Sequence, residues 1–313
     1  MPSSSHEREG AVRNIRHTRQ RARRAVPKTA RRFDLHVHSA VSDGLHAPAE
    51  VVRLAHEGGL GLIALTDHDA VEGIDEAIEA GARWGVAVIP GVEISAYAGE
   101  VELHVLGYLI RHGDARLQAT LARYRTSRLQ RAREMLARLE VLGIPLAWER
   151  VQELAERGST GRPHIARALV EAGYVTSVGE AFERYLRPGM PAYVPRDKAA
   201  PEEAIGLIHD AGGLAVLAHP WALVDHVAAL AAQGLDGLEA HYDGYAPNVV
   251  HYLRALAAEQ GLICTGGSDF HGLRLMPNNP IGGVAIPREC LRALYRRHRQ
   301  RSGRSQASEG VPL

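Results

Sequence analysis

Short apolar segments alternate with helix-like segments along most of the chain, and this alternation restricts the fold more than any other feature. Strands that alternate with helices predict an α/β fold with a parallel sheet. Functional side chains at the carboxyl ends of successive strands favour a barrel over an open sheet, although the pattern alone does not decide between them. The seven apolar segments are Phe33–His36, Leu60–Thr66, Val86–Glu93, Glu102–Tyr108, Leu214–His219, Gly237–His241 and Leu262–Gly266.

Residues 111–200 interrupt the alternation and predict a helical insertion. Asp114 can cap a long helix whose leucines form one apolar stripe. A second helix is expected over about 147–156. A third begins at Pro163, because proline is tolerated in a first helical turn. The body of the chain is therefore divided into two barrel segments, 33–110 and 201–287, and the insertion between them.

The two ends of the chain are strongly basic, whereas the body is acidic. Residues 1–32 carry ten Lys and Arg against two Glu, and residues 288–313 carry seven Arg against two Glu. Residues 33–287 carry 20 basic and 32 acidic side chains, which suits the binding of cations. We expect the ends to be solvated tails of low order, although basic tails could also contact nucleic acid.

Nothing in the sequence predicts export or insertion into a membrane. No run of 18 apolar residues exists, and the basic N-terminus lacks the apolar stretch of a secretory signal. The two cysteines, Cys264 and Cys290, have no CxxC partner and cannot build a disulfide framework. We therefore expect a cytoplasmic protein.

Imidazole and carboxylate side chains gather at the ends of the expected strands. His36 and His38 are two residues apart on one strand, so both rings project from the same face. A single histidine of this kind is commonly a core residue that bonds a backbone carbonyl, but a whole series at strand ends is not expected by chance. The series comprises His36, His38, Asp43, His68, Glu93, His104, His219, Asp269 and His271.

This series is chemically uniform, because it contains imidazoles and carboxylates and no thiolate. Structural zinc sites usually contain Cys, whereas N/O sites rich in carboxylates suit hydrolytic clusters of Zn, Mn or Fe. Nine ligands exceed the need of one ion. They fit two or three divalent metals that share bridging groups, an arrangement used in phosphoryl hydrolysis.

The motifs that carry these ligands resemble those of the PHP (polymerase and histidinol phosphatase) family, and the resemblance extends from residue 33 to about residue 286. Within the family, the insertion motif Thr160–Arg167 resembles a branch that includes 3′,5′-nucleoside-bisphosphate phosphatases and ribonuclease AM, which trims RNA from the 5′ end. The family motifs are His36-x-His38 with Asp43, Thr66-Asp67-His68, Glu93, His104, His219-Pro220 and Asp269-x-His271.

The resemblance implies a distorted (β/α)7 barrel with a trinuclear metal centre and a helical insertion. A hydroxide that bridges two metals would attack phosphorus, with Asp269 and His271 among the catalytic residues. The implied substrate is a nucleotide with a terminal phosphate: a 3′,5′-nucleoside bisphosphate, a nucleoside monophosphate or an RNA 5′ end. The implied ligand sets are His36, His38, Glu93 and Asp269 for the first metal, Glu93, His104 and His219 for the second, and Asp43, His68 and His271 for the third.

Three residues outside the ligand set are candidates for binding phosphate or for catalysis. Arg162 stands at a helix start, where free N–H groups favour an anion and Arg adds a bidentate donor pair. His164 could hold phosphate or protonate the leaving oxygen, and His241, at the end of the sixth expected strand, could do either. The alternatives are a surface Arg on a capped helix and a structural imidazole at His241.

Two other functions stay open. Histidinol-phosphate phosphatase is a competitor within the family, less favoured because the insertion motif resembles the nucleotide branch. A module that binds metal or nucleic acid without catalysis belongs to a different class. Loss of one or more ligands would mark such a module, and the sequence retains every ligand.

Overall fold

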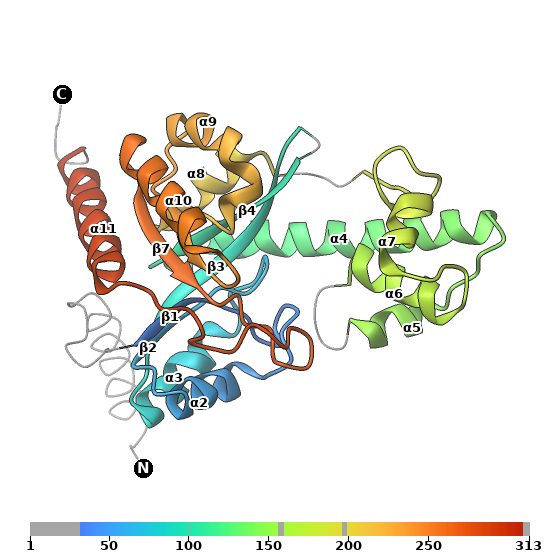
Figure 1. The fold of residues 1–313 in the computed structure, drawn as a ribbon, viewed down its shortest axis with the longest axis horizontal. Helices are drawn as coiled ribbons and strands as arrows, with labels where there is room; N and C mark the ends of the chain where they lie inside the picture. Colours follow the sequence, from blue (N-terminus) through green and yellow to red (C-terminus); the bar gives the residue numbers. More distant parts are fainter. Residues whose placement is uncertain (1–31, 100, 156–159, 196–198, 309–313) are drawn as a thin grey trace, which may run out of the picture.

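The structure is a computed structural model, and it describes residues 32–99, 101–155, 160–195 and 199–308. Seven strands form one sheet in chain order. Val37 also pairs with Phe270 just beyond the last strand, so the sheet nearly closes on itself (Figure 1). The expected α/β barrel is confirmed. The strands are β1 (Phe33–Val37), β2 (Leu62–Leu65), β3 (Ala87–Ala98), β4 (Val101–Tyr108), β5 (Leu214–Leu217), β6 (Gly237–Tyr242) and β7 (Ile263–Gly267).

One strand departs from the parallel arrangement. β4 runs antiparallel to both β3 and β5, whereas the other neighbouring strands are parallel. β3 ends at Ala98 and β4 begins at Val101. A connection this short can join only antiparallel strands, because a parallel crossover needs a dozen or more residues. The expectation of a parallel sheet is therefore wrong at β4, and the barrel is distorted there.

Helices cover the outer face of the barrel. Three of them begin with proline in their first turn, where its fixed φ suits a helix and its missing N–H is not needed. α8 packs on β3, β4 and β5, and α10 packs on β6 and β7. A continuous apolar core lies between these helices and the strands. The covering helices are α2 (Pro48–Glu57), α3 (Ile74–Trp84), α8 (Pro201–Asp210), α9 (Val227–Ala232) and α10 (Pro247–Glu259).

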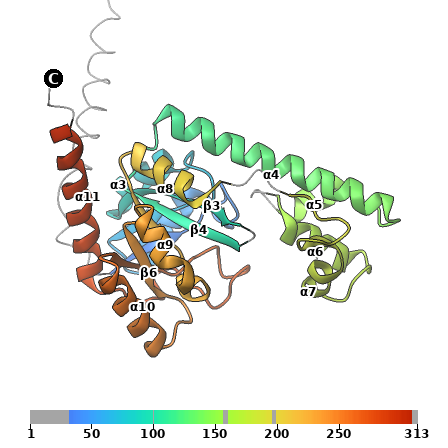
Figure 2. The ribbon, with the colours of Figure 1, turned by 90° about the horizontal axis from the view of Figure 1, so that it is seen from above.

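The insertion projects from the barrel and has a core of its own (Figure 2). Its longest element, α4 (Ala115–Val141), is capped as expected, since the Asp114 side chain accepts hydrogen bonds from two backbone N–H groups. Buried Met135 and Leu139 on α4 belong to the same apolar cluster as residues of the other insertion helices. These are α5 (Trp148–Leu154), α6 (Arg162–Glu171), α7 (Val178–Ala181) and the π-helical turn η1 (Phe182–Leu186).

The basic C-terminal segment forms a helix, α11 (Arg288–Ser308), rather than the solvated tail that we expected. Leu291 and Leu294 of α11 are buried in one apolar cluster with Phe33 and Leu35 of β1, and α11 packs on β7 and β5. Arg292, Arg296 and Arg299 are exposed, whereas Arg297 and Arg301 face the barrel, each 3.9 Å from Asp236 Oδ1. The expected N-terminal tail lies outside the described residues, apart from Arg32.

Candidate metal centre

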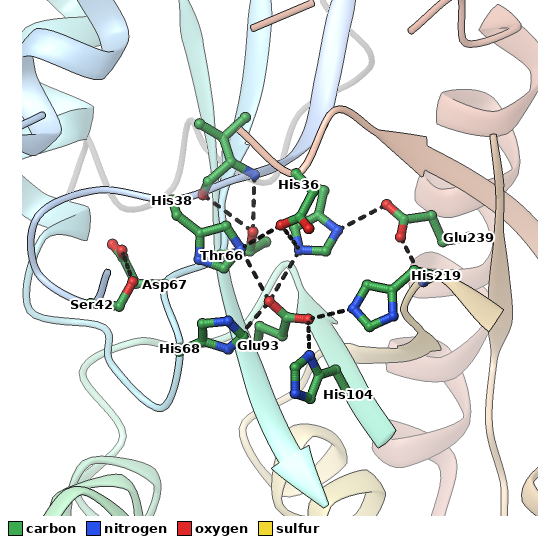
Figure 3. Close-up of polar contacts among 12 residues, drawn as sticks. His36, His38, Ser42, Thr66, Asp67, His68, Glu93, His104, His219 and Glu239 are labelled. Atoms are coloured by element: carbon green, nitrogen blue, oxygen red, sulfur yellow. Dashed lines mark hydrogen bonds and ion pairs between the residues drawn. The ribbon is translucent and has the colours of Figure 1, made fainter. Parts of the chain in front are cut away.

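Glu93 on β3 lies at the centre of a cluster of imidazoles at one end of the barrel (Figure 3). Its Oε2 atom is 3.1 Å from the Nε2 atoms of both His36 and His38 and 3.3 Å from His68 Nδ1. Its Oε1 atom is 2.9 Å from His104 Nδ1 and 3.5 Å from His219 Nε2. Burial alone would raise the pKa of Glu93, but these imidazoles hold it well below its usual range.

Two aspartates extend the cluster on either side of His38. Asp269 Oδ1 is 3.1 Å from His38 Nε2 and 3.2 Å from His36 Nε2. Asp43 Oδ1 is 3.2 Å from His271 Nε2, and its Oδ2 is 3.7 Å from His68 Nε2. The structure therefore brings together all nine side chains that the sequence singled out as ligands.

The ligand atoms of these side chains converge in three groups. In each group they lie within 4.8 Å of one another. The first group reproduces the set expected for the first metal; the second adds His38 to the set expected for the third metal. The third contains His68 where His219 was expected, although His219 lies beside it. The groups are His36, His38, Glu93 and Asp269, then His38, Asp43, His68 and His271, and finally His68, Glu93 and His104.

The donor set fits divalent metal ions. Both ring nitrogens of His38, Nδ1 of His68 and of His104, and Oε1 of Glu93 are buried and make no hydrogen bond of good geometry, although they lie close to one another. Each unpaired buried polar atom costs free energy, so a cluster of them facing one another needs a further group to satisfy it. Imidazole and carboxylate ligands in this number suit a hydrolytic metal cluster.

A second layer of side chains holds the cluster in place. Glu239 on β6 is fully buried; its Oε1 is 3.0 Å from His36 Nδ1, and its Oε2 accepts a hydrogen bond from the His219 backbone N–H at 2.8 Å. The Tyr242 hydroxyl donates to Asp269 Oδ2 at 2.9 Å. Such partners fix the tautomer and orientation of a ligand. Glu239 and Tyr242 were not predicted from the sequence.

Asp67 holds the loop that carries Asp43. It accepts hydrogen bonds from the backbone N–H and hydroxyl of Ser39 and from the hydroxyl of Ser42, at 2.6–2.8 Å. Ser42 Oγ also lies 3.2 Å from Asp43 Oδ1. Asp67 thus reaches the cluster through this loop, in keeping with an orienting role.

Backbone strain is concentrated beside the cluster. Asp69, His219 and Asp269 all have positive φ, at 49°, 30° and 55°. Such a conformation is unfavourable for residues other than glycine, and it persists only where the surroundings impose it. Each of these residues lies in the loop that follows a strand, β2, β5 or β7.

His241 does not join the cluster. A register irregularity falls between Glu239 and His241 on β6, and it places Tyr242, rather than His241, toward Asp269. His241 is buried instead on the outer side, where Arg254 of α10 and Glu289 of α11 act on it. Burial lowers the pKa of His241. The alternative of a structural imidazole fits this placement.

Arg162 and His164 are both engaged in local contacts. Arg162 Nη2 donates to Glu102 Oε2 on β4 at 2.9 Å, and its guanidinium lies over the Phe182 ring at 5.7 Å. His164 Nδ1 accepts a hydrogen bond from the Gly161 backbone N–H at 3.1 Å. Burial lowers the pKa of His164, and Asp43 and Arg128 also act on it electrostatically, which places the ring toward the cluster.

Arg128 is a cation beside the cluster that sequence reasoning did not single out from the other arginines of α4. Its Nη2 atom is 2.6 Å from Asp69 Oδ2 and 3.2 Å from Ser95 Oγ. It also acts electrostatically on the neighbouring His104. Arg128 therefore connects the insertion helix to the residue that follows His68.

Comparison with known proteins identifies the family. The PHP domain model matches residues 34–124. The chain is 37% identical over 247 residues to the 3′,5′-nucleoside bisphosphate phosphatase of Chromobacterium violaceum, covering 76% of this chain and 87% of that protein. It is 40% identical over 249 residues to the 5′-3′ exoribonuclease Rnm of Escherichia coli, covering 76% and 85%.

Among solved structures, a protein of Bifidobacterium adolescentis assigned as a metal-dependent phosphoesterase superimposes with a TM-score of 0.72 at 33% identity, covering 85% of this chain and 96% of its own. This chain therefore belongs to the PHP domain family. It is a metal-dependent phosphoesterase of that family, with His, Asp and Glu clusters able to bind metal ions. Within the described residues, no helix is both long and apolar enough to span a membrane.

Proposed function

We propose that this phosphoesterase removes the terminal phosphate of a nucleotide: a 3′,5′-nucleoside bisphosphate, a nucleoside monophosphate or the 5′ end of RNA. The observation that carries the proposal is the convergence of nine imidazole and carboxylate ligands beside an insertion that presents cationic and neutral donors. The names of the two relatives, a nucleoside bisphosphate phosphatase and a 5′-3′ exoribonuclease, support the same substrate class.

We propose two or three divalent metal ions, Mn, Fe or Zn, as the resident cofactors. His36, His38, Glu93 and Asp269 would hold the first ion. When bound, such ions lower the pKa of water and offset negative charge on a phosphoryl group. The remaining ligands would be Glu93, His104 and His219 for the second ion, and Asp43, His68 and His271 for the third.

His164 would act as a hydrogen-bond donor to phosphate. Its lowered pKa keeps the ring neutral near pH 7, and its Nδ1 already accepts the Gly161 N–H. The proton of the neutral ring is therefore on Nε2, which can donate to a phosphoryl oxygen. A neutral ring is a poor general acid, so we favour binding over protonation of the leaving group.

Arg162 and Arg128 would supply positive charge to the phosphate. A guanidinium has five N–H donors. The structure engages one nitrogen of Arg162 with Glu102 and one of Arg128 with Asp69 and Ser95, which leaves donors on each that could meet an anion. His241 has no part in this phosphate site, because its side chain faces Arg254 and Glu289 rather than the cluster.

We further propose that 33–110 and 201–287 form the catalytic barrel, that 111–200 selects the substrate, and that the protein works in the cytoplasm. The two cysteines, Cys264 and Cys290, are both free thiols, which fits a reducing compartment.

Phosphate release from a substrate panel tests the proposed activity. The protein is loaded with Mn²⁺, its metal content is measured, and adenosine 3′,5′-bisphosphate, the matching 5′-monophosphate, a 5′-phosphorylated oligonucleotide and histidinol phosphate are compared. We expect kcat/KM to be highest for one of the nucleotides. A preparation that holds two or three metals and releases no phosphate from any nucleotide would refute the proposal.

A further inference from the structure

Two large aromatic side chains, Trp221 and Tyr252, stand exposed and in contact with each other. Trp221 is 46% exposed and Tyr252 is 48% exposed. Their ring centroids are 5.8 Å apart, with the planes at 83°. Trp221 belongs to the 3-10 helix η2 (Pro220–His226), and Tyr252 belongs to α10. Single exposed apolar residues need no explanation, but a paired and exposed aromatic surface is typical of a binding site.

This pair is connected to the metal centre by further aromatic rings. The Trp221 backbone N–H donates to the Tyr245 hydroxyl at 3.1 Å. The Tyr245 ring is 5.1 Å from the Tyr242 ring, which is 5.6 Å from the His219 ring. Tyr242 also bonds Asp269. The exposed pair therefore lies at the rim of the same end of the barrel, two tyrosine rings away from the cluster.

Trp84 provides an internal comparison. It is exposed to a similar degree, at 41%, and it too contacts an aromatic ring, that of His56, at 5.3 Å. However, it ends α3 just before β3 begins, so it lies at the amino ends of the strands, away from the cluster. Exposure alone therefore does not distinguish Trp221 and Tyr252. Their continuity with the metal centre does.

We propose that Trp221 and Tyr252 form a stacking platform for a nucleobase of a single-stranded oligonucleotide whose terminal phosphate lies at the metal centre. The inference rests on the proposed function and favours the oligonucleotide among its substrates. Aromatic faces stack on any base, because every base has a π-face, so the platform would tolerate many sequences. Two tyrosine rings lie between the platform and the metal centre. The stacked base would therefore belong to a nucleotide further along the oligonucleotide than the one that carries the cleaved phosphate.

The kinetic test compares Trp221→Ala/Tyr252→Ala with the matched control Trp84→Ala. The probes are a 5′-phosphorylated hexaadenylate and p-nitrophenyl phosphate, which has no base. Removing base stacking raises KM for the hexamer by about 5- to 150-fold, with kcat unchanged. The double variant hydrolyses p-nitrophenyl phosphate like the wild type. The single variant Trp221→Phe, which keeps an aromatic ring at this position, has the KM of the wild type for the hexamer. A hexamer KM in the folded double variant that is unchanged from the wild type overturns the platform.

A binding test keeps the platform separate from turnover. The chain has three tryptophans, so Trp84→Phe/Trp148→Phe leaves Trp221 as the sole indole fluorophore. We expect the hexamer to quench its fluorescence and an abasic hexamer of the same charge not to do so. Equal or absent quenching by the two hexamers overturns the platform. Quenching without phosphate release from any nucleotide instead counts against the proposed activity and supports the platform.

Discussion

Glu239→Gln should weaken metal binding although Glu239 is not itself among the proposed ligands. The Glu239 carboxylate faces His36 Nδ1 and accepts a hydrogen bond from the His219 N–H, and it is fully buried. Gln is nearly the same size, but it has only one acceptor oxygen, and its NH₂ group must face one of the two donors. The substitution therefore removes one charge-assisted hydrogen bond and sets donor against donor.

The magnitude follows from that single lost interaction. A hydrogen bond to a charged group contributes about 1.5–3 kcal/mol. Since about 1.4 kcal/mol corresponds to a tenfold change, the expected loss is roughly 10- to 150-fold in affinity for the metal held by His36. Outer-shell substitutions at metal sites typically cost about 10- to 100-fold, which agrees.

The assay is a competition titration of Mn²⁺ or Zn²⁺ into metal-free protein, followed by kcat/KM at saturating metal. The matched control is Glu203→Gln on α8, where an exposed carboxylate accepts from Tyr124 and has no contact with the cluster. We expect the control to bind metal as the wild type does. A folded Glu239→Gln protein with unaltered metal affinity and unaltered kcat/KM would show that Glu239 does not orient His36.

Four further outcomes are expected. Asp269→Asn abolishes turnover and reduces metal content, measured by elemental analysis, because it removes a carboxylate that faces two imidazoles; full kcat would contradict its place in the first group. Arg162→Ala raises KM for phosphorylated substrates with metal content intact, whereas metal loss would make Arg162 structural. Leu294→Ala lowers the free energy of unfolding, measured with urea, by about 2–5 kcal/mol, because it opens a cavity between α11 and the barrel; a smaller effect would mean that α11 hardly stabilises the barrel. Burial raises the pKa of Cys290 from 9.0 to about 12, so the buried thiol stabilises the fold fully below pH 9 and loses that contribution as the pH rises toward 12. Cys290→Ala should therefore flatten the fall in Tm between pH 9 and pH 12. Rapid iodoacetamide labelling of the native protein at pH 9 would contradict this prediction.

The ligand set could be predicted because it depends on short-range order. Two residues on a strand share a face, so His36 and His38 had to point the same way. Strand ends meet at one end of a barrel, so Asp269, just after β7, had to lie close to them. Glu93 was also expected at a strand end, but β3 continues to Ala98, and Glu93 meets the cluster where it pairs with His68. These rules need no knowledge of how the helices pack, and all nine side chains do converge.

The same rules could not predict that Tyr242, rather than His241, faces the metal centre. Strict alternation from Glu239 places His241 on the inner face, but the irregularity in the β6–β7 pairing reverses the order. No residue in the β6 segment marks it. Gly266 on β7 allows the close approach, because a Cβ atom there would lie 2.4 Å from the His241 carbonyl oxygen. That contact is a property of the pair of strands and cannot be read from either alone.

Arg128 eluded prediction for a related reason. Several arginines line α4, and a long helix with exposed arginines is usually a solvated face. Arg125 reaches the Asp69 backbone carbonyl and Arg128 its carboxylate. Which arginines do so depends on the angle at which the insertion docks, and that angle is set by contacts distant in sequence. The sequence therefore indicated a cationic insertion but not the residue that meets the cluster.

α4 explains how an insertion can take part in the site at all. Its first half contributes Leu117 and Leu121 to the barrel core, and its second half contributes Met135 and Leu139 to the insertion core. One continuous helix of 27 residues, about 40 Å long, therefore belongs to both cores. Moving the insertion relative to the barrel would require a break in this helix. Arg128 lies between the two halves, so the same rigidity that joins the cores fixes a cation beside the metal ligands.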